Sequence, residues 1–237
     1  MDALARDLEA LLETSARVPP SPPTAPTIVG RRAEIDRIGS ILDAIVGPGG
    51  RGHTVVIAGE AGIGKTTLVE EVVRLRASGG SLPVGNASFR EGRAGYRPIA
   101  DAMESVLRAM PLGSERILER LRAAPRRKRG TGFPETLDSA FALLAGAGPF
   151  LLVLENLHDA GPDAVEALRV AASALPTTRG LLLLTYRPEE RLATGVGSVR
   201  GCLGWVPGER LVERLARWRV HAEETAELLA RMLPGDR

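Results

Sequence analysis

One eight-residue segment constrains the fold of this chain more than any other. It begins at Gly59, ends at Thr66 and fits the pattern G-x-x-x-x-G-K-[ST]. Residues 54–58 before it are mostly β-branched and apolar, as in a buried parallel strand, and residues 67–75 after it carry apolar side chains at helical spacing. A strand, a glycine-rich loop and a helix in this order form the phosphate-binding P-loop, so the segment is predicted to bind a nucleotide phosphate.

The residue types in this loop suit an anionic ligand. Glycines let the backbone take positive φ and approach a phosphate without a Cβ in the way, and the loop N–H groups and the helix N-terminus point at the anion. Lys65 supplies a positive charge for the β- and γ-phosphates, and Thr66 offers its hydroxyl to Mg²⁺. The expected ligand is ATP with Mg²⁺; the alternative is a glycine-rich turn without a ligand. The predicted nucleotide-binding residues of the loop are Gly59, Glu60, Ala61, Gly62, Ile63, Gly64, Lys65, Thr66 and Thr67.

Composition excludes several other classes of protein. The 237 residues are 44% hydrophobic and 25% charged, which is ordinary for a soluble globular domain. The single cysteine, Cys202, cannot build a disulfide framework or a zinc site, and the three histidines lack metal-ligand spacing. No apolar run approaches the roughly 18 residues of a membrane span, and the N-terminus has no apolar signal segment. A cytoplasmic protein that does not enter membranes is therefore expected.

The chain divides into three parts by composition. Residues 1–26 hold an amphipathic helix over 2–17 and a proline-rich linker, and that helix could dock either on the domain or on a partner. Residues 27–221 form the predicted compact core, and residues 222–237 the start of a helical lid. The basic run at 126–129 is interpreted as a solvated loop, with a nucleic-acid patch as the alternative.

Apolar periodicity predicts strands that alternate with helices along the core. The expected strands are 54–58, a segment within 82–89, 150–154 and 181–186, and the expected helices are 31–46, 67–75, 99–110, 115–123, 134–145, 163–175 and 222–232. Residues 195–208 look like a loop, and the end of the ambiguous segment 211–220 could form a last strand. This alternation implies a three-layer α/β P-loop NTPase domain, a mostly parallel sheet covered by helices on both faces.

A second acidic motif follows the third expected strand. Four apolar residues end in Glu155, which is the Walker B arrangement that holds Mg²⁺ at a strand end, usually through water. Glu155 lies about 90 residues after the P-loop, and Arg187 follows the next strand. Because ligands bind at the carboxyl ends of parallel strands, the P-loop, Glu155 and Arg187 are expected at one edge of the sheet. Thr66 and Glu155 are the predicted metal ligands.

Five segments together resemble a known family. Residues 27–35 look like its "VGRxxEl" entry motif, and the P-loop matches as well. The other three segments are 96–99, similar to "PYxPxxEAL", 154–162, similar to "LEDLHWADP", and 182–189, similar to "LLLTYRPEE". The chain thus resembles the signal-transduction ATPases with numerous domains (STAND, AAA-type P-loop NTPases), of the kind found in large LuxR-type transcriptional regulators. The resemblance covers about residues 27–233.

The resemblance implies roles for residues outside the P-loop. Val29, Gly30 and Arg31 would contact the nucleotide, where the alternative is an ordinary helix N-terminus. Arg187 would sense the γ-phosphate, a role that suits a cation just past a strand end; the alternative is a surface arginine that caps the strand.

One departure from the family bears on catalysis. The position of the acid that activates the attacking water is occupied by Asn156, and a carboxamide cannot act as a base at neutral pH. Asp159 could in principle supply a carboxylate, although it lies three residues out of register. The expected catalytic residues are Lys65, Glu155, Asn156 and Arg187, in a site that binds ATP and hydrolyses it slowly.

The expected function is a nucleotide-dependent switch in a transcriptional or other regulator. Its partners would be effector or DNA-binding domains or proteins outside this chain, because no direct nucleic-acid motif is present. The family's lid would begin where this sequence ends, so the isolated domain is expected to be a monomer. The alternatives are a competent ATPase motor or loader, a degenerate interaction module that no longer uses nucleotide, and, more weakly, a kinase.

Overall fold

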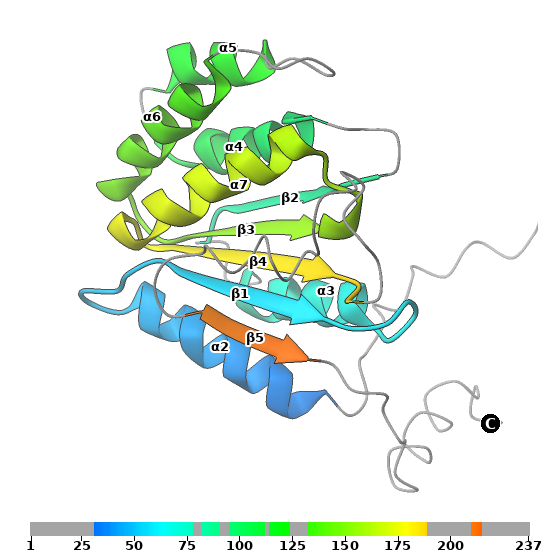
Figure 1. Cartoon of the computed structure of the whole chain (residues 1–237). Helices are drawn as coiled ribbons and strands as arrows, with labels where there is room; N and C mark the ends of the chain where they lie inside the picture. Colours follow the sequence, from blue (N-terminus) through cyan, green and yellow to red (C-terminus); the bar gives the residue numbers. More distant parts are fainter. Residues whose placement is uncertain are drawn as a thin grey trace, which may run out of the picture.

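Five parallel strands form one sheet in the order β2-β3-β4-β1-β5 (Figure 1). The structure, a computed structural model, describes residues 31–77, 82–90, 95–111, 114–123, 132–188 and 210–214. The strands are β1 (His53–Ala58), β2 (Val84–Ser88), β3 (Phe150–Glu155), β4 (Gly180–Tyr186) and β5 (Arg210–Arg214). Because all of them run in the same direction, their carboxyl ends share one edge of the sheet, and β4 separates β1 from β3 there.

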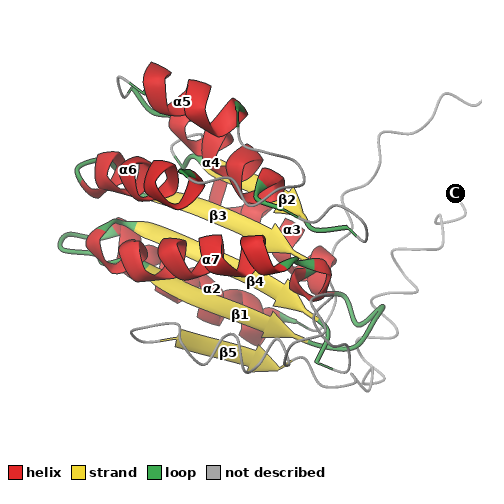
Figure 2. Ribbon diagram, turned by 45° about the horizontal axis from the view of Figure 1, so that its top comes forward, coloured by secondary structure: helices red, strands yellow, loops and turns green. Residues whose placement is uncertain are grey.

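Helices cover both faces of this sheet, as Figure 2 shows. On one face lie α2 and α3, and on the other lie α4, α6 and α7, with α5 packed outside α4 and α6. Their bounds are α2 (Arg32–Val46), α3 (Lys65–Ala77), α4 (Arg97–Ala109), α5 (Glu115–Arg122), α6 (Phe133–Ala145) and α7 (Pro162–Ala174), with short 3₁₀ turns η1 (Leu157–Asp159) and η2 (Leu175–Thr177). The predicted three-layer α/β architecture is confirmed.

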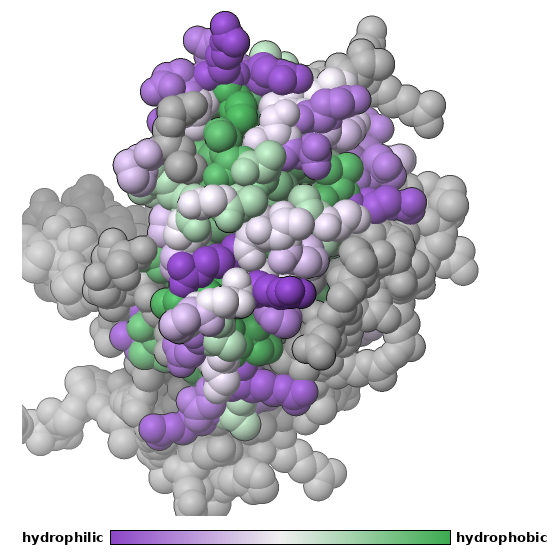
Figure 3. Space-filling view, turned by 90° about the vertical axis from the view of Figure 1, so that its left-hand side faces the viewer, coloured by the Kyte–Doolittle hydropathy of each residue, from purple (hydrophilic) through white to green (hydrophobic). Residues whose placement is uncertain are grey.

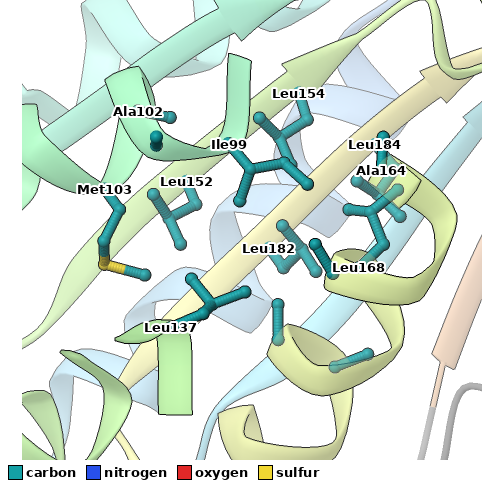
Figure 4. Packing of buried hydrophobic residues seen from close by; sticks show 14 of the residues in the cluster. Ile99, Ala102, Met103, Leu137, Leu152, Leu154, Ala164, Leu168, Leu182 and Leu184 are labelled. Atoms are coloured by element: carbon teal, nitrogen blue, oxygen red, sulfur yellow. The ribbon is translucent and has the colours of Figure 1, made fainter. Parts of the chain in front are cut away.

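The central strands β3 and β4 are apolar on both sides because both of their faces are covered. Alternate side chains of a strand point to opposite faces, so Leu152 and Leu182 pack toward α4 and α7, whereas Val153 and Leu183 pack toward α2 and α3. The first of these two cores is drawn in Figure 4, where Leu168 of α7 reaches the strands. Burial of both faces therefore explains the continuous leucine runs, which the sequence predicts to be buried strands.

Helix α3, which begins at the P-loop, carries a bidentate ion pair. Arg74 donates two hydrogen bonds to the Glu71 carboxylate, at 2.8 and 2.7 Å. These hydrogen bonds hold the pKa of Glu71 below its usual value. The pair is a local feature of the helix and begins about one turn beyond Thr67, the last residue predicted to bind the nucleotide.

The C-terminus of α2 is held by an arginine that is distant in sequence but adjacent in space. Arg179, just before β4, donates to the carbonyl oxygens of Ile45 at 3.2 Å and Gly47 at 3.3 Å, and also to that of Val46. The last carbonyls of a helix have no partner within the helix, so a cation that binds them satisfies acceptors and complements the helix dipole. Arg179 therefore fixes α2 to the start of β4.

The variant Arg179→Ala is expected to lower the free energy of unfolding by about 1.5–3 kcal/mol, the usual contribution of hydrogen bonds to a charged group. Urea denaturation of both proteins measures this difference. Arg179→Lys is the matched control, because it keeps the charge but not the planar fork and should lose only part of the stability. Equal denaturation midpoints for the wild type and Arg179→Ala would refute this account of the contact.

The expected helices and strands agree with the structure within a few residues, with one exception. Segment 211–220 is ambiguous in the sequence, with an end that could form a strand; β5 lies at its start, Arg210–Arg214, and residues 215–220 lie outside the described part of the chain. β5 pairs with β1 and covers backbone groups that would otherwise form an open sheet edge. The expectations for 2–17, 195–208 and 222–232, and the domain boundaries near 27 and 222, lie outside the described residues.

Candidate nucleotide-binding site

The P-loop connects the end of β1 to the start of α3 at the carboxyl edge of the sheet. Its backbone is anchored by a hydrogen bond from Gly59 N to Tyr186 O at 3.3 Å. Gly62 and Gly64 have φ of 74° and 92°, values that side chains other than glycine rarely adopt. A Cβ at either position would meet no atom of the described residues within 4 Å. These two positions are therefore strained for any other residue, and the space beside them is open.

Lys65 is the first residue of α3 and is 8% exposed. Its Nζ donates hydrogen bonds to Gly59 O at 2.7 Å and Glu60 O at 2.8 Å. These bonds hold the ammonium across the loop, with its charge at the N-terminus of α3. Together with the helix dipole, this charge makes the loop attractive to an anion.

The two predicted metal ligands are in direct contact. Thr66 Oγ1 donates a hydrogen bond to Glu155 Oε2 at 2.7 Å, across 89 residues of sequence. Glu155 is the last residue of β3 and is 8% exposed. Mg²⁺ prefers oxygen ligands and usually takes one or two from the protein, with phosphates and waters completing its shell. A threonine hydroxyl and a carboxylate beside an open phosphate loop fit this ion. Within the described ranges, no group of three or more His, Cys, Asp or Glu could hold a metal by itself.

Asn156 adopts a left-handed backbone conformation directly after Glu155. Its φ is 60°, and it is the only residue other than glycine with a positive φ in the described part of the chain. Asparagine tolerates this conformation better than most residues. The backbone N–H of Asn156 donates to Thr185 Oγ1 at 3.1 Å, and its Nδ2 donates to Ser88 Oγ at 2.9 Å. Asn156 thus connects the ends of β2, β3 and β4.

Sequence reasoning missed Ser88 and Thr185 as parts of this site. They lie 68 and 29 residues from Asn156. Both are common polar residues without a motif of their own, and only the strand order brings them to Asn156. Thr185 does lie in the segment that resembles a family motif, but that resemblance pointed to Arg187.

The remaining predicted residues flank the P-loop. Arg31, before α2, is 8% exposed and donates from Nη1 to Glu34 Oε1 at 2.9 Å and from Nη2 to Ile63 O at 3.5 Å. It therefore contacts the phosphate loop, while Val29 and Gly30 lie outside the described residues.

Arg187 directly follows β4 and is half-buried. Gly59 N donates to the carbonyl of Tyr186, the residue before Arg187, so the backbone of Arg187 lies close in space to the start of the loop.

Asp159, the alternative source of a catalytic carboxylate, lies in the η1 turn beyond Asn156. Its N–H donates to Asn156 O at 2.9 Å, and its Oδ2 lies 4.0 Å from His158 Nε2. The carboxylate thus lies beside the adjacent, buried histidine. Its contacts with the described residues are made within this turn.

A separate hollow lies between α6 and α7, away from the P-loop. It has a volume of about 370 Å³ and is lined by Asp138, Arg169, Val170, Ser173 and Ala174. Figure 3 shows this end of the molecule, where hydrophilic and hydrophobic residues are interspersed. None of the predicted site residues lines the hollow, so the candidate site is the P-loop edge.

Comparisons with solved structures agree with the fold. Cdc6p from Pyrobaculum aerophilum is 17% identical, with a TM-score of 0.51 over 89% of this chain and 51% of its own. ORC1 from Aeropyrum pernix, solved in complex with DNA, is 18% identical, with a TM-score of 0.52 over 89% and 51%. A chain of the HORMA:CdnC:Trip13 complex from E. coli MS115-1 is 17% identical, with a TM-score of 0.50 over 88% and 69%. This chain spans about half the length of the first two proteins, and these likenesses show the fold alone.

Comparison with protein families is more specific. A family model for the AAA ATPase domain matches residues 27–184, from before α2 to the end region of β4. None of the curated proteins compared with the chain matches it. Across the described ranges, no helix is long and apolar enough to cross a membrane. The matched segment contains the P-loop, both predicted metal ligands and Asn156, and the chain therefore belongs to the family of AAA ATPase domains, which are nucleotide-binding P-loop domains.

Proposed function

We propose that this domain binds ATP together with Mg²⁺ and acts as a nucleotide-dependent switch that hydrolyses ATP slowly. The observation that carries the proposal is the 2.7 Å contact between Thr66 and Glu155 beside an open P-loop. The residue that follows Glu155 is Asn156, which has an amide in place of a carboxylate. The contact supports a metal–phosphate site, and the amide supports slow turnover.

Each residue of the loop has a defined part in this proposal. Gly62 and Gly64 leave room for the phosphates, Lys65 neutralises the β- and γ-phosphates, and the loop N–H groups bind their oxygens. Thr66 and Glu155 hold the cation, which when bound neutralises charge on the phosphates. Val29, Gly30 and Arg31 would lie beside the base and ribose, and the Arg31 contact with Ile63 O is consistent with a position near the loop.

Slow hydrolysis follows from the chemistry of Asn156. Its amide oxygen can accept a hydrogen bond from a water, but it cannot take the proton of that water. A positioned general base contributes typically about 10²–10⁴-fold to a rate. A site that binds ATP tightly without this contribution keeps the ATP-bound state long-lived, which suits a switch better than a motor.

The role in regulation rests on the family resemblance of the sequence motifs. These motifs resemble those of STAND ATPases in LuxR-type regulators, and the effector and DNA-binding parts of such a regulator would lie outside this chain. A switch operates only if ATP and ADP favour different conformations. Arg187, just beyond β4, is the proposed sensor of the γ-phosphate, because a cation there would interact with ATP and not with ADP.

The proposal is tested by measuring ATP affinity of the full chain with and without Mg²⁺, together with steady-state turnover. Mg²⁺-dependent binding with turnover well below one per minute supports a switch. Turnover of tens per minute would favour a motor or loader that uses another base. The absence of ATP binding would favour a degenerate interaction module.

Glu155→Gln is expected to weaken ATP binding in Mg²⁺ by about tenfold, the effect of losing one charged contact, and to leave binding in EDTA unchanged. The reason is that the substitution removes a negative charge facing the cation while keeping the size of the side chain. Titration of ATP at several Mg²⁺ concentrations measures the effect. The exposed Glu119→Gln is the matched control and should behave as the wild type. If Glu155→Gln binds ATP–Mg²⁺ as tightly as the wild type, Glu155 is not a metal ligand.

A further inference from the structure

Thr185 lies on the same face of the sheet as the predicted metal site. Along β4, Leu181 and Leu183 face the layer of α2 and α3, and Thr185 continues that alternation. In the neighbouring strand it pairs in register with Ile57, which also faces this layer. Its side chain is buried, with 1% exposure. A hydroxyl is thus enclosed at the edge of the sheet where the P-loop begins.

The hydroxyl of Thr185 accepts a hydrogen bond that a backbone carbonyl would accept in a regular sheet. The pairing of β3 with β4 reaches Leu154 and Leu184. Two residues beyond Leu154, just past the end of β3, the N–H of Asn156 donates to Thr185 Oγ1 at 3.1 Å. This side-chain acceptor satisfies the N–H while the backbone leaves the extended conformation and turns to φ 60°. This backbone conformation also brings Asn156 Nδ2 within 2.9 Å of Ser88 Oγ.

We infer that Thr185 is a positioning residue that fixes Asn156 in its left-handed turn and thereby sets how strongly the site distinguishes ATP from ADP. The inference rests on the proposed function, because it takes the Asn156 amide oxygen to hold the water that would lie next to the γ-phosphate. Thr185 acts through Asn156 and needs no contact with nucleotide. A residue with no acceptor at position 185 leaves the Asn156 N–H without its bond, and the turn relaxes toward extended backbone.

Two substitutions separate this role from simple stabilisation of the sheet. Thr185→Val keeps the shape and β-branching and removes the acceptor, while Thr185→Ser keeps the acceptor. In the nucleotide-free full chain, hydrogen exchange of residues 150–160 is expected to be about tenfold faster in Thr185→Val, the effect of one hydrogen bond, and unchanged in Thr185→Ser. Residues 53–58 of β1 should exchange at the wild-type rate in both variants. Faster exchange throughout β1 and β4 would indicate a purely structural role and overturn the inference.

The second measurement is affinity for ADP and for a non-hydrolysable ATP analogue, each with Mg²⁺. In Thr185→Val the analogue is expected to bind about tenfold more weakly relative to ADP, with ADP affinity itself unchanged, and Thr185→Ser should restore the wild-type ratio. Equal weakening of both nucleotides, or no change in the ratio, would overturn the inference. A wild-type chain that binds neither nucleotide would refute the proposed function and the part of the inference concerning ATP and ADP. The exchange experiment would then still decide whether Thr185 fixes Asn156.

Discussion

ATP with Mg²⁺ is expected to raise the melting temperature of this domain by roughly 5–10 °C, and Lys65→Ala to abolish most of that rise. A ligand at a hundredfold excess over its Kd stabilises the folded state by about 2.7 kcal/mol, and a domain of this size gains roughly 2–4 °C for each kcal/mol. The effect of Lys65→Ala should be large because the ammonium is held at the loop by two carbonyl oxygens, where phosphate would bind.

Thermal denaturation with and without nucleotide measures this effect, and the sequence offers a close control. Lys65 and Lys128 are its only lysines, so Lys128→Ala removes the same charge elsewhere in the chain and should keep the full rise. Comparison of the two variants without nucleotide shows whether Lys65→Ala itself destabilises the fold. A melting curve of the wild type that does not move in saturating ATP–Mg²⁺ would refute nucleotide binding.

Asn156→Asp is expected to raise kcat by about 10²-fold, the lower end of the contribution of a general base, while ATP affinity stays within a few-fold. The substitution puts a carboxylate next to Glu155 at the strand end. The structure adds a requirement. Asn156 donates to Ser88 Oγ, and the Ser88 hydroxyl itself bonds to Phe89 O at 3.2 Å. A carboxylate can only accept, so the Ser88 hydroxyl must rotate toward it.

Single-turnover and steady-state phosphate release measure this gain. The other asparagine of the chain, Asn86, is exposed on β2, so Asn86→Asp is a control for added charge and should leave kcat unchanged. Ser88→Ala in the Asn156→Asp background tests whether the rotated hydroxyl is needed. Brisk hydrolysis by the wild type, unchanged in Asn156→Asp, would show that the base lies elsewhere and would favour the motor alternative.

The sequence alone predicts the central strands of this domain and the residues at their carboxyl ends. The leucine runs predicted β3 and β4 because strands covered on both faces need apolar residues throughout. The motifs predicted that Thr66 and Glu155 lie at the same edge of the sheet, because parallel strands end at one edge. That the two side chains contact each other directly is seen only in the structure. The start of β5 was not predicted as a strand: segment 211–220 begins with pairs of apolar residues separated by a polar pair, which does not show the apolar/polar alternation of a strand.

The partners of Asn156 show what the sequence could not reveal. Spacing along the chain places a residue at a strand end, but it does not say which other strands are neighbours. Ser88 and Thr185 reach Asn156 because β3 lies between β2 and β4. Likewise, the motif placed Arg31 near a nucleotide, but its contact with Ile63 O depends on how α2 packs against the sheet.

The strand order also affects the sequence of events in folding. β1, the P-loop and α3 are contiguous in sequence, so the loop can form from local contacts, which are quick to assemble. The contact between Thr66 and Glu155 joins residues that are 89 positions apart in sequence, and β4 lies between β1 and β3, the strands that precede them. Such long-range contacts carry a larger entropic cost of closure. We therefore expect the phosphate loop to form early in folding and the contact between Thr66 and Glu155 to form late, so that a ligand which needs both mainly lowers the rate of unfolding.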